Sequence, residues 1–275
     1  MSRPFLKMNG LGNDFVVVEA RSAPFHPGPE DARAIADRQS GIGCDQIIAI
    51  EPSTRADAFM RIWNADGGEV EACGNATRCV GWLLLEASGK GSAVIETGAG
   101  LLGVTRGGEQ LITVDMGEPG LDWAAIPLAE EMDTRGIELQ VGPIDAPILH
   151  TPACVNMGNP HTVFFVADAE TAPVREAGSM IEHHPLFPDR TNVEFAQVKA
   201  RDRIRLRVWE RGVGETQACG TGACATLVAA ARRGLTDRKA TLEMNGGELV
   251  IDWREADDHV LMTGPVTLEF TGTLP

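Results

Sequence analysis

The sequence has no long hydrophobic run and little positive charge, and each lack argues against a class of protein. No stretch approaches the about 18 uninterrupted apolar residues of a membrane-spanning helix. The 24 basic residues are outnumbered by 39 acidic ones, which argues against a nucleic-acid partner because binding one needs a basic surface. The N-terminal segment also lacks the apolar core of a secretory signal. We therefore expect a cytoplasmic protein with no membrane or nucleic-acid partner, in a compartment where thiols stay reduced.

The sequence also has no CxxC pair, the spacing that zinc sites and thiol redox motifs use. Cys73 and Cys79 are too widely spaced for such a pair, and so are Cys219 and Cys224. We expect no bound metal and no disulfide. Four of the six cysteines are assigned to the buried core: Cys44, Cys79, Cys154 and Cys224.

One stretch of the chain occurs twice, without a gap. Residues 61–74 read RIWNADGGEVEACG, and residues 207–220 read RVWERGVGETQACG. Seven of the 14 aligned positions are identical, and the offset of 146 residues is the interval from Cys73 to Cys219. The same offset, applied elsewhere, aligns three further polar pairs: Asn13 with Asn159, Gln46 with Asn192, and Asn64 with Glu210. The chain is therefore interpreted as an internal duplication, with two similar halves related by an approximate two-fold axis.

Each half is predicted to be a sheet around one buried helix. Residues 75–88 are apolar on most sides and are followed by Gly89, while the Ala-rich residues 221–233 are followed by Gly234. Short strands are expected around them, one of them over 148–155. The predicted fold class is α/β, of the α+β kind: two pseudo-symmetric domains, each a curved and mostly antiparallel β-sheet or barrel wrapped around a central helix, with the active site in the cleft between them. A linker near Glu118–Pro127 ends the first domain at residue 118, and the second starts at 119.

The repeated cysteine precedes its helix in both halves, and this position suggests chemistry. Free backbone N–H groups and a partial positive charge at a helix N-terminus lower the pKa of a thiol and bind anions such as a carboxylate. If the halves face each other, Cys73 and Cys219 lie on opposite sides of one substrate carbon. One thiolate then removes a proton and one thiol returns a proton to the other face, which is epimerisation or racemisation.

The polar residues that share the offset are expected to line the same site. Glu210 and Arg211 break the symmetry, because Asn64 and Ala65 stand at the equivalent positions. An acid and a base on one side only suggest recognition of a second amino-acid head, with Arg211 on its carboxylate. His161 is a candidate for tuning the pKa of a thiol.

The chain resembles diaminopimelate epimerases. The motifs that carry the resemblance run over nearly the whole chain: GLGNDF (10–15), GCDQ (43–46), NADG (64–67), ACGNATRC (72–79), MGNPH (157–161), RTNVEF (190–195) and ERGVGETQACGTGAC (210–224). Ala76 and Thr77 depart from the family pattern, which often has glycine and alanine there, one turn into the helix.

The resemblance implies interconversion of LL- and meso-2,6-diaminopimelate without cofactor or metal, in lysine and peptidoglycan-precursor synthesis, by a homodimer. It implies Cys73 and Cys219 as the acid–base pair, and His161 and Glu210 as residues that modulate the pKa of these thiols. It also implies that the final residues, 266–275, join the first domain. The substrate-binding positions it implies are Asn13, Gln46, Asn64, Gly74, Asn75, Asn159, Asn192, Glu210, Arg211, Gly220 and Thr221.

Three other interpretations remain open. A related racemase acting on proline or hydroxyproline would use the same two thiols, but its substrate has no second charged head for Glu210 and Arg211. A thiol redox protein would join Cys73 to Cys219 in a working disulfide. A binding module would need neither thiol activated.

Overall fold

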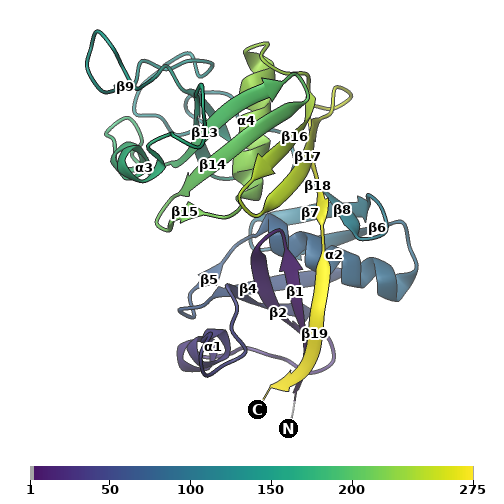
Figure 1. Cartoon of the computed structure of the whole chain (residues 1–275). Coiled ribbons are helices and arrows are strands. Elements are labelled where there is room, and N and C mark those ends of the chain that lie inside the picture. The colour runs from purple at the N-terminus through teal and green to yellow at the C-terminus, as the bar shows by residue number, and fades with distance from the viewer. Residues whose placement is uncertain (1–2, 275) are drawn as a thin grey trace. The chain divides into compact units, whose positions relative to one another are not determined.

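The computed structural model describes residues 3–274, and these pack as two units (Figure 1). The first unit contains residues 3–115 and 263–274, and the second contains residues 116–262. Both boundaries lie three residues before those expected from the sequence. The first boundary comes early because Met116 already belongs to the second unit: its backbone N–H donates to the carbonyl of Val260, 2.9 Å away. Across residues 3–274, no helix combines the length and the apolar character needed to cross a membrane.

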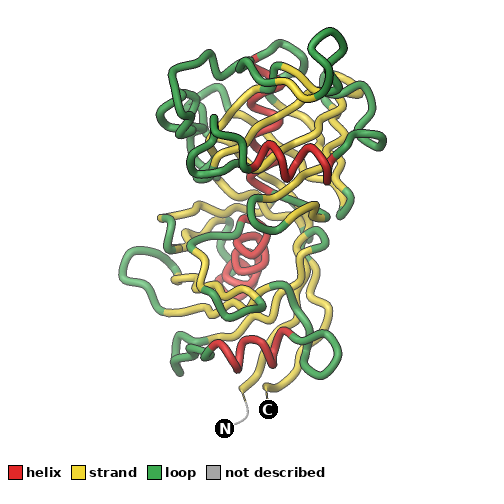
Figure 2. The backbone as a smooth tube through the Cα atoms, turned by 90° about the vertical axis from the view of Figure 1, so that its left-hand side faces the viewer, coloured by secondary structure: helices red, strands yellow, loops and turns green. Residues whose placement is uncertain are grey.

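The first unit is a mostly antiparallel sheet around a central helix, α2 (Gly74–Ser88), drawn in red inside the strands in Figure 2. A shorter helix, α1 (Pro29–Ala36), buries Ala32 and Ala36 against the sheet. The strands are β1 (Arg3–Gly10), β2 (Asn13–Glu19), β3 (Gln46–Glu51), β4 (Ala58–Asn64), β5 (Glu69–Val70), β6 (Ser92–Thr97), β7 (Gly100–Arg106), β8 (Leu111–Asp115) and β19 (Thr267–Leu274). They pair in the order β19-β1-β2-β3-β4-β6-β7-β8, with β5 added to β4, and only β2 with β3 and β4 with β6 are parallel.

The second unit has the same plan around α4 (Gly220–Arg232), with α3 (Val174–Glu182) on its outside. Its strands are β9 (Gln140–Val141), β10 (Leu149–His150), β11 (Ala153–Asn156), β12 (Pro160–Phe165), β13 (Asn192–Ala200), β14 (Arg203–Glu210), β15 (Gly214–Thr216), β16 (Lys239–Met244) and β17 (Gly247–Trp253). The strand β18 (Val260–Pro265) begins in the second unit and ends in the first. As in the first unit, two neighbouring pairs run parallel, β12 with β13 and β14 with β16.

The offset found in the sequence also relates the two sheets. In the first unit the parallel pair β2–β3 aligns Phe15 with Gln46, and in the second β12–β13 aligns His161 with Asn192. Helices α2 and α4 begin at Gly74 and Gly220, and the outer helices α1 and α3 correspond within a residue. The duplication predicted from the sequence is therefore confirmed at the level of elements and of strand register.

Helix and strand ends follow from backbone conformation. Gly89 ends α2 in the left-handed region, with φ 68°, and donates to the carbonyl of Leu85. Gly234 has φ 69° just beyond α4. Both helices were predicted within a residue or so. The strand expected over 148–155 is wrong: Thr151 has φ 49°, a left-handed conformation that divides the segment into β10 and β11.

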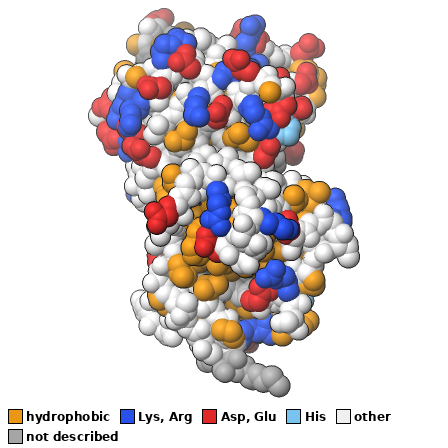
Figure 3. All heavy atoms as spheres, turned by 90° about the vertical axis from the view of Figure 1, so that its right-hand side faces the viewer, with side chains coloured by type: hydrophobic (Ala, Val, Ile, Leu, Met, Phe, Trp, Pro, Cys, Tyr) orange, Lys and Arg blue, Asp and Glu red, His pale blue; other side chains and the backbone are white. Residues whose placement is uncertain are grey.

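Hydrophobic side chains gather on the surface of the first unit, as Figure 3 shows for one face. Five large apolar residues of its strands are more than a third exposed: Val94, Leu101, Leu111, Leu268 and Phe270. Contiguous apolar surface of this kind often marks a contact with another protein chain, whereas single exposed apolar side chains are ordinary.

Helix α3 packs very closely on Trp209 of β14. A methyl group added at Gly178 of α3 would lie 2.5 Å from Cγ of Trp209, which is nearer than carbon atoms can approach. Glycine is therefore required at this position by packing, although alanine is the better helix former by about 1 kcal/mol.

We expect the substitution Gly178→Ala to lower the melting temperature. Overpacking of this kind costs about 1–3 kcal/mol, which exceeds the gain in helix propensity. Gly91→Ala is the matched control, because a methyl group there meets no atom within 4 Å. Thermal unfolding of the three proteins measures the effect, and a Gly178→Ala protein as stable as the wild type would contradict the packing described.

Candidate active site

Cys73 and Cys219 occupy the same structural position, the N-cap of α2 and of α4. Their backbones are extended, with φ,ψ of −149°,112° and −127°,111°. The sulfur of Cys219 accepts a hydrogen bond from the backbone N–H of Gly222 at 3.4 Å and lies 3.5 Å from the hydroxyl of Thr221. Each cysteine thus stands at the end of a helix that offers unsatisfied N–H groups.

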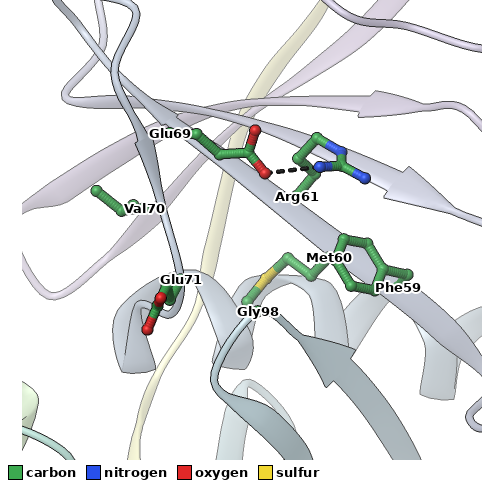
Figure 4. A pocket seen from close by; sticks show the side chains of 7 residues that line it. All are labelled: Phe59, Met60, Arg61, Glu69, Val70, Glu71 and Gly98. Atoms are coloured by element: carbon green, nitrogen blue, oxygen red, sulfur yellow. Dashed lines mark hydrogen bonds and ion pairs between the residues drawn. The ribbon is translucent and has the colours of Figure 1, made fainter.

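A hairpin with an arginine–glutamate pair leads into each cysteine. In the first unit Arg61 pairs with Glu69 at 2.6 Å, and in the second Arg207 pairs with Glu215 at 2.6 Å. Figure 4 shows the first pair at the wall of a pocket of about 240 Å³, which Glu71 and Gly98 also line. None of the predicted site residues lines this pocket. The repeated arginine and glutamate therefore hold the hairpins that present the thiols.

Asn13 is held from two sides in the first unit. Its amide nitrogen donates to Asp45 Oδ2 at 2.9 Å, and its amide oxygen accepts from Asn75 Nδ2 at 2.9 Å. The turn before it passes through Leu11 and Gly12, both with positive φ. Asn75 is the second residue of α2, so Asn13 lies at the start of that helix.

An ion-pair cluster supports Asp45 from behind. Arg38 donates to Asp45 Oδ1 at 2.7 Å and to both oxygens of Asp14, which the buried Lys7 also contacts. Burial alone would raise the pKa of Asp14, but the hydrogen bonds from Arg38 and Lys7 hold that pKa well below its usual range. The cluster keeps Asp14 ionised and fixes the carboxylate that holds Asn13.

Gln46 and Asn64 lie opposite each other on β3 and β4. The amide nitrogen of Gln46 donates to Asn64 Oδ1 at 2.9 Å. The first unit thus joins its predicted polar residues in two hydrogen-bonded pairs, Asn13 with Asn75 and Gln46 with Asn64.

A buried chain of hydrogen bonds runs through the second unit. His161 Nε2 lies 2.9 Å from Asn159 Oδ1, and His161 Nδ1 lies 2.6 Å from Glu194 Oε1. The side chains of His161 and Glu194 are both fully buried. Glu194 was not predicted: on β13 it alternates with Val193 and Phe195, which reads as a solvent-facing position unless both faces of the strand are covered.

The loop after β14 presents Arg211. The backbone N–H of Arg211 donates to Asn192 Oδ1 at 2.9 Å, and its guanidinium donates to the carbonyl of Asp189. The buried carboxylate of Glu182 accepts from the N–H of Gly212 at 2.9 Å and from the indole of Trp209 at 2.7 Å. Glu182, another residue that the sequence did not single out, therefore fixes the loop that carries Arg211.

The pKa of the Cys219 thiol is raised, contrary to the expectation from its helix terminus. Burial is the largest cause, followed by the charges of Glu210 and Glu194, and these outweigh the hydrogen bonds from Thr221 and Gly222. Burial likewise raises the pKa of Glu210, although Thr216 and Cys219 hydrogen-bond to it. The prediction of a lowered thiol pKa is therefore wrong for Cys219 in this structure.

The remaining cysteines are core residues, as predicted: all four are at least 98% buried. Burial raises the pKa of Cys44 to about 11 and that of Cys79 and Cys154 to about 12, so these thiols stay protonated near neutral pH. Cys73 is only partly buried, whereas Cys219 is buried.

Comparison with known proteins agrees with the repeated architecture. The family model described as diaminopimelate epimerase matches residues 5–121 and 153–269. A diaminopimelate epimerase of Phenylobacterium zucineum is 65% identical over 275 residues, covering 100% of this chain and 99% of the relative. One from Caulobacter sp. K31 is 62% identical over 284 residues, covering 100% and 98%.

Solved structures show the same fold at low identity. A Bacillus anthracis protein of the PhzF phenazine-biosynthesis family has a TM-score of 0.69 at 15% identity, over 100% of this chain and 99% of that one. A hydroxyproline epimerase from Agrobacterium vitis has a TM-score of 0.68 at 17% identity, over 99% and 92%. On the full-length sequence matches, the chain belongs to the diaminopimelate epimerase family.

Proposed function

We propose that the protein is an epimerase that interconverts LL- and meso-2,6-diaminopimelate. The observation that carries the proposal is the pair of helix N-cap cysteines, Cys73 and Cys219, in a chain 65% identical over its full length to a curated diaminopimelate epimerase. The reaction belongs to lysine and peptidoglycan-precursor synthesis.

In the proposed reaction the two thiols act on opposite faces of one α-carbon. One begins as thiolate and removes the α-proton; the other begins as thiol and donates its proton to the opposite face. Each sulfur ends in the protonation state in which the other began, so the roles exchange with reaction direction. No cofactor is needed in this scheme, because side chains and helix termini supply acid, base and charge stabilisation.

Helix N-termini are the proposed binding site of the α-carboxylate. The backbone N–H groups at the starts of α2 and α4 are the donors, and the helix dipoles stabilise the charge that the carboxylate gains as the α-proton leaves. The residues assigned to this role are Gly74, Asn75, Gly220 and Thr221.

Polar side chains are proposed to bind the rest of the substrate, including its non-reacting amino-acid head. Arg211 is exposed and charged, and we assign it to the distal carboxylate, with Glu210 near the distal ammonium. His161 and Glu210 are also assigned to modulation of the pKa of the thiols. The other polar residues of this set are Asn13, Gln46, Asn64, Asn159 and Asn192.

We further propose that the protein works in the cytoplasm as a homodimer, with no membrane or nucleic-acid partner. The exposed apolar residues of the first unit support a contact with a second copy of the chain. Light scattering after size-exclusion chromatography tests this, and a monomer at micromolar concentration would contradict it.

The test of the proposed function is turnover of LL-2,6-diaminopimelate, followed by chromatographic separation of its stereoisomers. We expect meso product to accumulate to equilibrium, with no turnover of trans-4-hydroxy-L-proline. A proline derivative has no second charged head for Glu210 and Arg211 to bind. Turnover of the proline derivative alone would assign the protein to the related racemases.

Replacing either Cys73 or Cys219 with alanine is expected to abolish epimerisation while the protein stays folded. Each thiol is the only proposed acid or base on its side of the α-carbon. Cys224→Ala is the matched control, since Cys224 is fully buried on the same helix that Cys219 precedes. Near-normal turnover by either the Cys73 or the Cys219 variant in both directions would refute the two-thiol mechanism.

Arg211→Ala is expected to raise KM far more than it lowers kcat. Losing a charged hydrogen bond costs roughly 1.5–3 kcal/mol, which corresponds to about a tenfold to hundredfold weaker binding. Arg211→Lys keeps the charge but not the planar fork, so it should lie between the alanine variant and the wild type. Steady-state kinetics measure the effect, and an unchanged KM would remove Arg211 from the site.

A further inference from the structure

Glu182, the last residue of α3, is a buried carboxylate with no part in the proposed proton transfer. Its side chain is only 3% exposed. Oε1 accepts from the backbone N–H of Gly212 at 2.9 Å, and Oε2 accepts from the indole of Trp209 at 2.7 Å. The guanidinium of Arg190 lies 3.7 Å from Oε1. These three neighbours are all donors, which suits a carboxylate, because an ionised carboxyl group only accepts hydrogen bonds.

The turn that Glu182 contacts is the one that carries Arg211. It joins β14 to β15, and Gly212 within it has φ 75°, a left-handed conformation that favours glycine. The N–H groups of Arg211 and Gly212 donate to side chains of other elements, the first to Asn192 Oδ1 and the second to Glu182. The conformation of this turn therefore depends on partners outside the hairpin.

The side chain of Arg211 is held by a segment that Glu182 also contacts. The guanidinium of Arg211 donates to the carbonyl of Asp189 at 2.9 Å. The next residue, Arg190, has a left-handed backbone, with φ 60°, and its own guanidinium faces Glu182. Glu182 thus contacts both supports of Arg211: the backbone that follows it and the segment that receives its guanidinium.

The first unit lacks both charged residues. At the offset of 146 residues, Ala36 stands at the position of Glu182 and Ala65 at the position of Arg211. Glu182 and Ala36 are each the last residue of their helix, α3 or α1, so the two positions are equivalent in the structure as well. The carboxylate and the arginine are present together in one half and are both alanine in the other, which indicates that they act together.

The first unit fastens the equivalent turn with the opposite charge. There Arg33 of α1 donates to the carbonyl of Asp66, which has the position of Gly212, at 3.1 Å. Asp66 also closes the turn locally, because its own carboxylate accepts from the N–H of Gly68 at 2.8 Å. The helix outside the sheet therefore contacts the same turn residue in both units, through a cation in the first and through an anion in the second.

We infer that Glu182 is a positioning residue for substrate recognition, which holds the turn of Arg211 in the conformation that binds the distal carboxylate. Glu182 acts through Arg211, because its own oxygens are buried and already accept from groups of the protein. A turn that is ordered before binding spares the substrate the entropic cost of ordering it. The inference rests on the proposed function and deepens it, since it names the residue that prepares the site for a second charged head.

Steady-state kinetics of Glu182→Ala test the inference. The substitution copies Ala36 of the first unit and removes both acceptor oxygens. We expect KM for diaminopimelate to rise about tenfold, because the turn must then be ordered on binding, while kcat stays close to that of the wild type. Glu182→Gln keeps the shape and one acceptor oxygen, so its KM should lie between the two. Glu176→Ala, the same change at an exposed position of α3, is the control and should leave KM unchanged.

A double variant separates positioning of Arg211 from a general effect on the fold. If Glu182 acts through Arg211, Glu182→Ala should raise KM no further in a protein that already carries Arg211→Ala. A purely structural role would add its effect in both backgrounds and would lower kcat as well. An unchanged KM in the single variant, or equal effects with and without Arg211, would overturn the inference.

Hydrogen–deuterium exchange without substrate gives a readout that is independent of the reaction. We expect the segment 210–214 to exchange faster in Glu182→Ala than in the wild type, because the amide of Gly212 loses its acceptor, and to be unchanged in Glu176→Ala. Unchanged exchange in Glu182→Ala would overturn the inference even in an active epimerase. Faster exchange in a protein that does not turn over diaminopimelate would refute the proposed function, while still showing that Glu182 holds the turn.

Discussion

The structure depends on the backbone N–H groups of the first helical turn, which need hydrogen-bond acceptors from outside the helix. The first N–H groups of α2 and α4 have no acceptor within their own helix, and each helix begins directly after a hairpin that ends in Ala-Cys-Gly. The hairpin is fixed by an arginine–glutamate pair in both units. This arrangement places a sulfur and a set of free donors at one point, which suits a carboxylate-bearing carbon acid.

The duplication is kept in the elements that carry Cys73 and Cys219 and is altered at three positions on the neighbouring strands. The hairpins, strand registers and helix starts coincide at one offset. In contrast, Phe15, Ile48 and Asn64 of the first unit correspond to His161, Glu194 and Glu210 of the second. The second unit thus carries titratable side chains at positions where the first unit has none.

Much of the fold could be predicted from the sequence, because local signals repeat. The apolar pattern and the glycines that follow it predict the two central helices and where they end. The repeated cysteine marks where each helix begins. The polar partners could not be predicted in the same way. Glu194, Glu182 and Asp45 act on residues 27 to 33 positions away, and a glutamate in an alternating strand gives no sign that both faces are covered. The prediction of a lowered thiol pKa failed at Cys219 for a related reason. The sequence indicates that Cys219 precedes a helix, but it does not indicate that Cys219 is buried.

The central claim is that two groups, one on each face of the α-carbon, transfer the proton. Brief incubation of one stereoisomer of diaminopimelate with the protein in deuterated water tests it most directly, with mass spectrometry of substrate and product at low conversion. The account predicts that the product carries deuterium at the inverted α-carbon while recovered substrate carries hydrogen, because the returning proton comes from a different thiol. Deuterium in the recovered substrate at the same rate as in the product, or product that retains the original hydrogen, would indicate a single base and contradict the account.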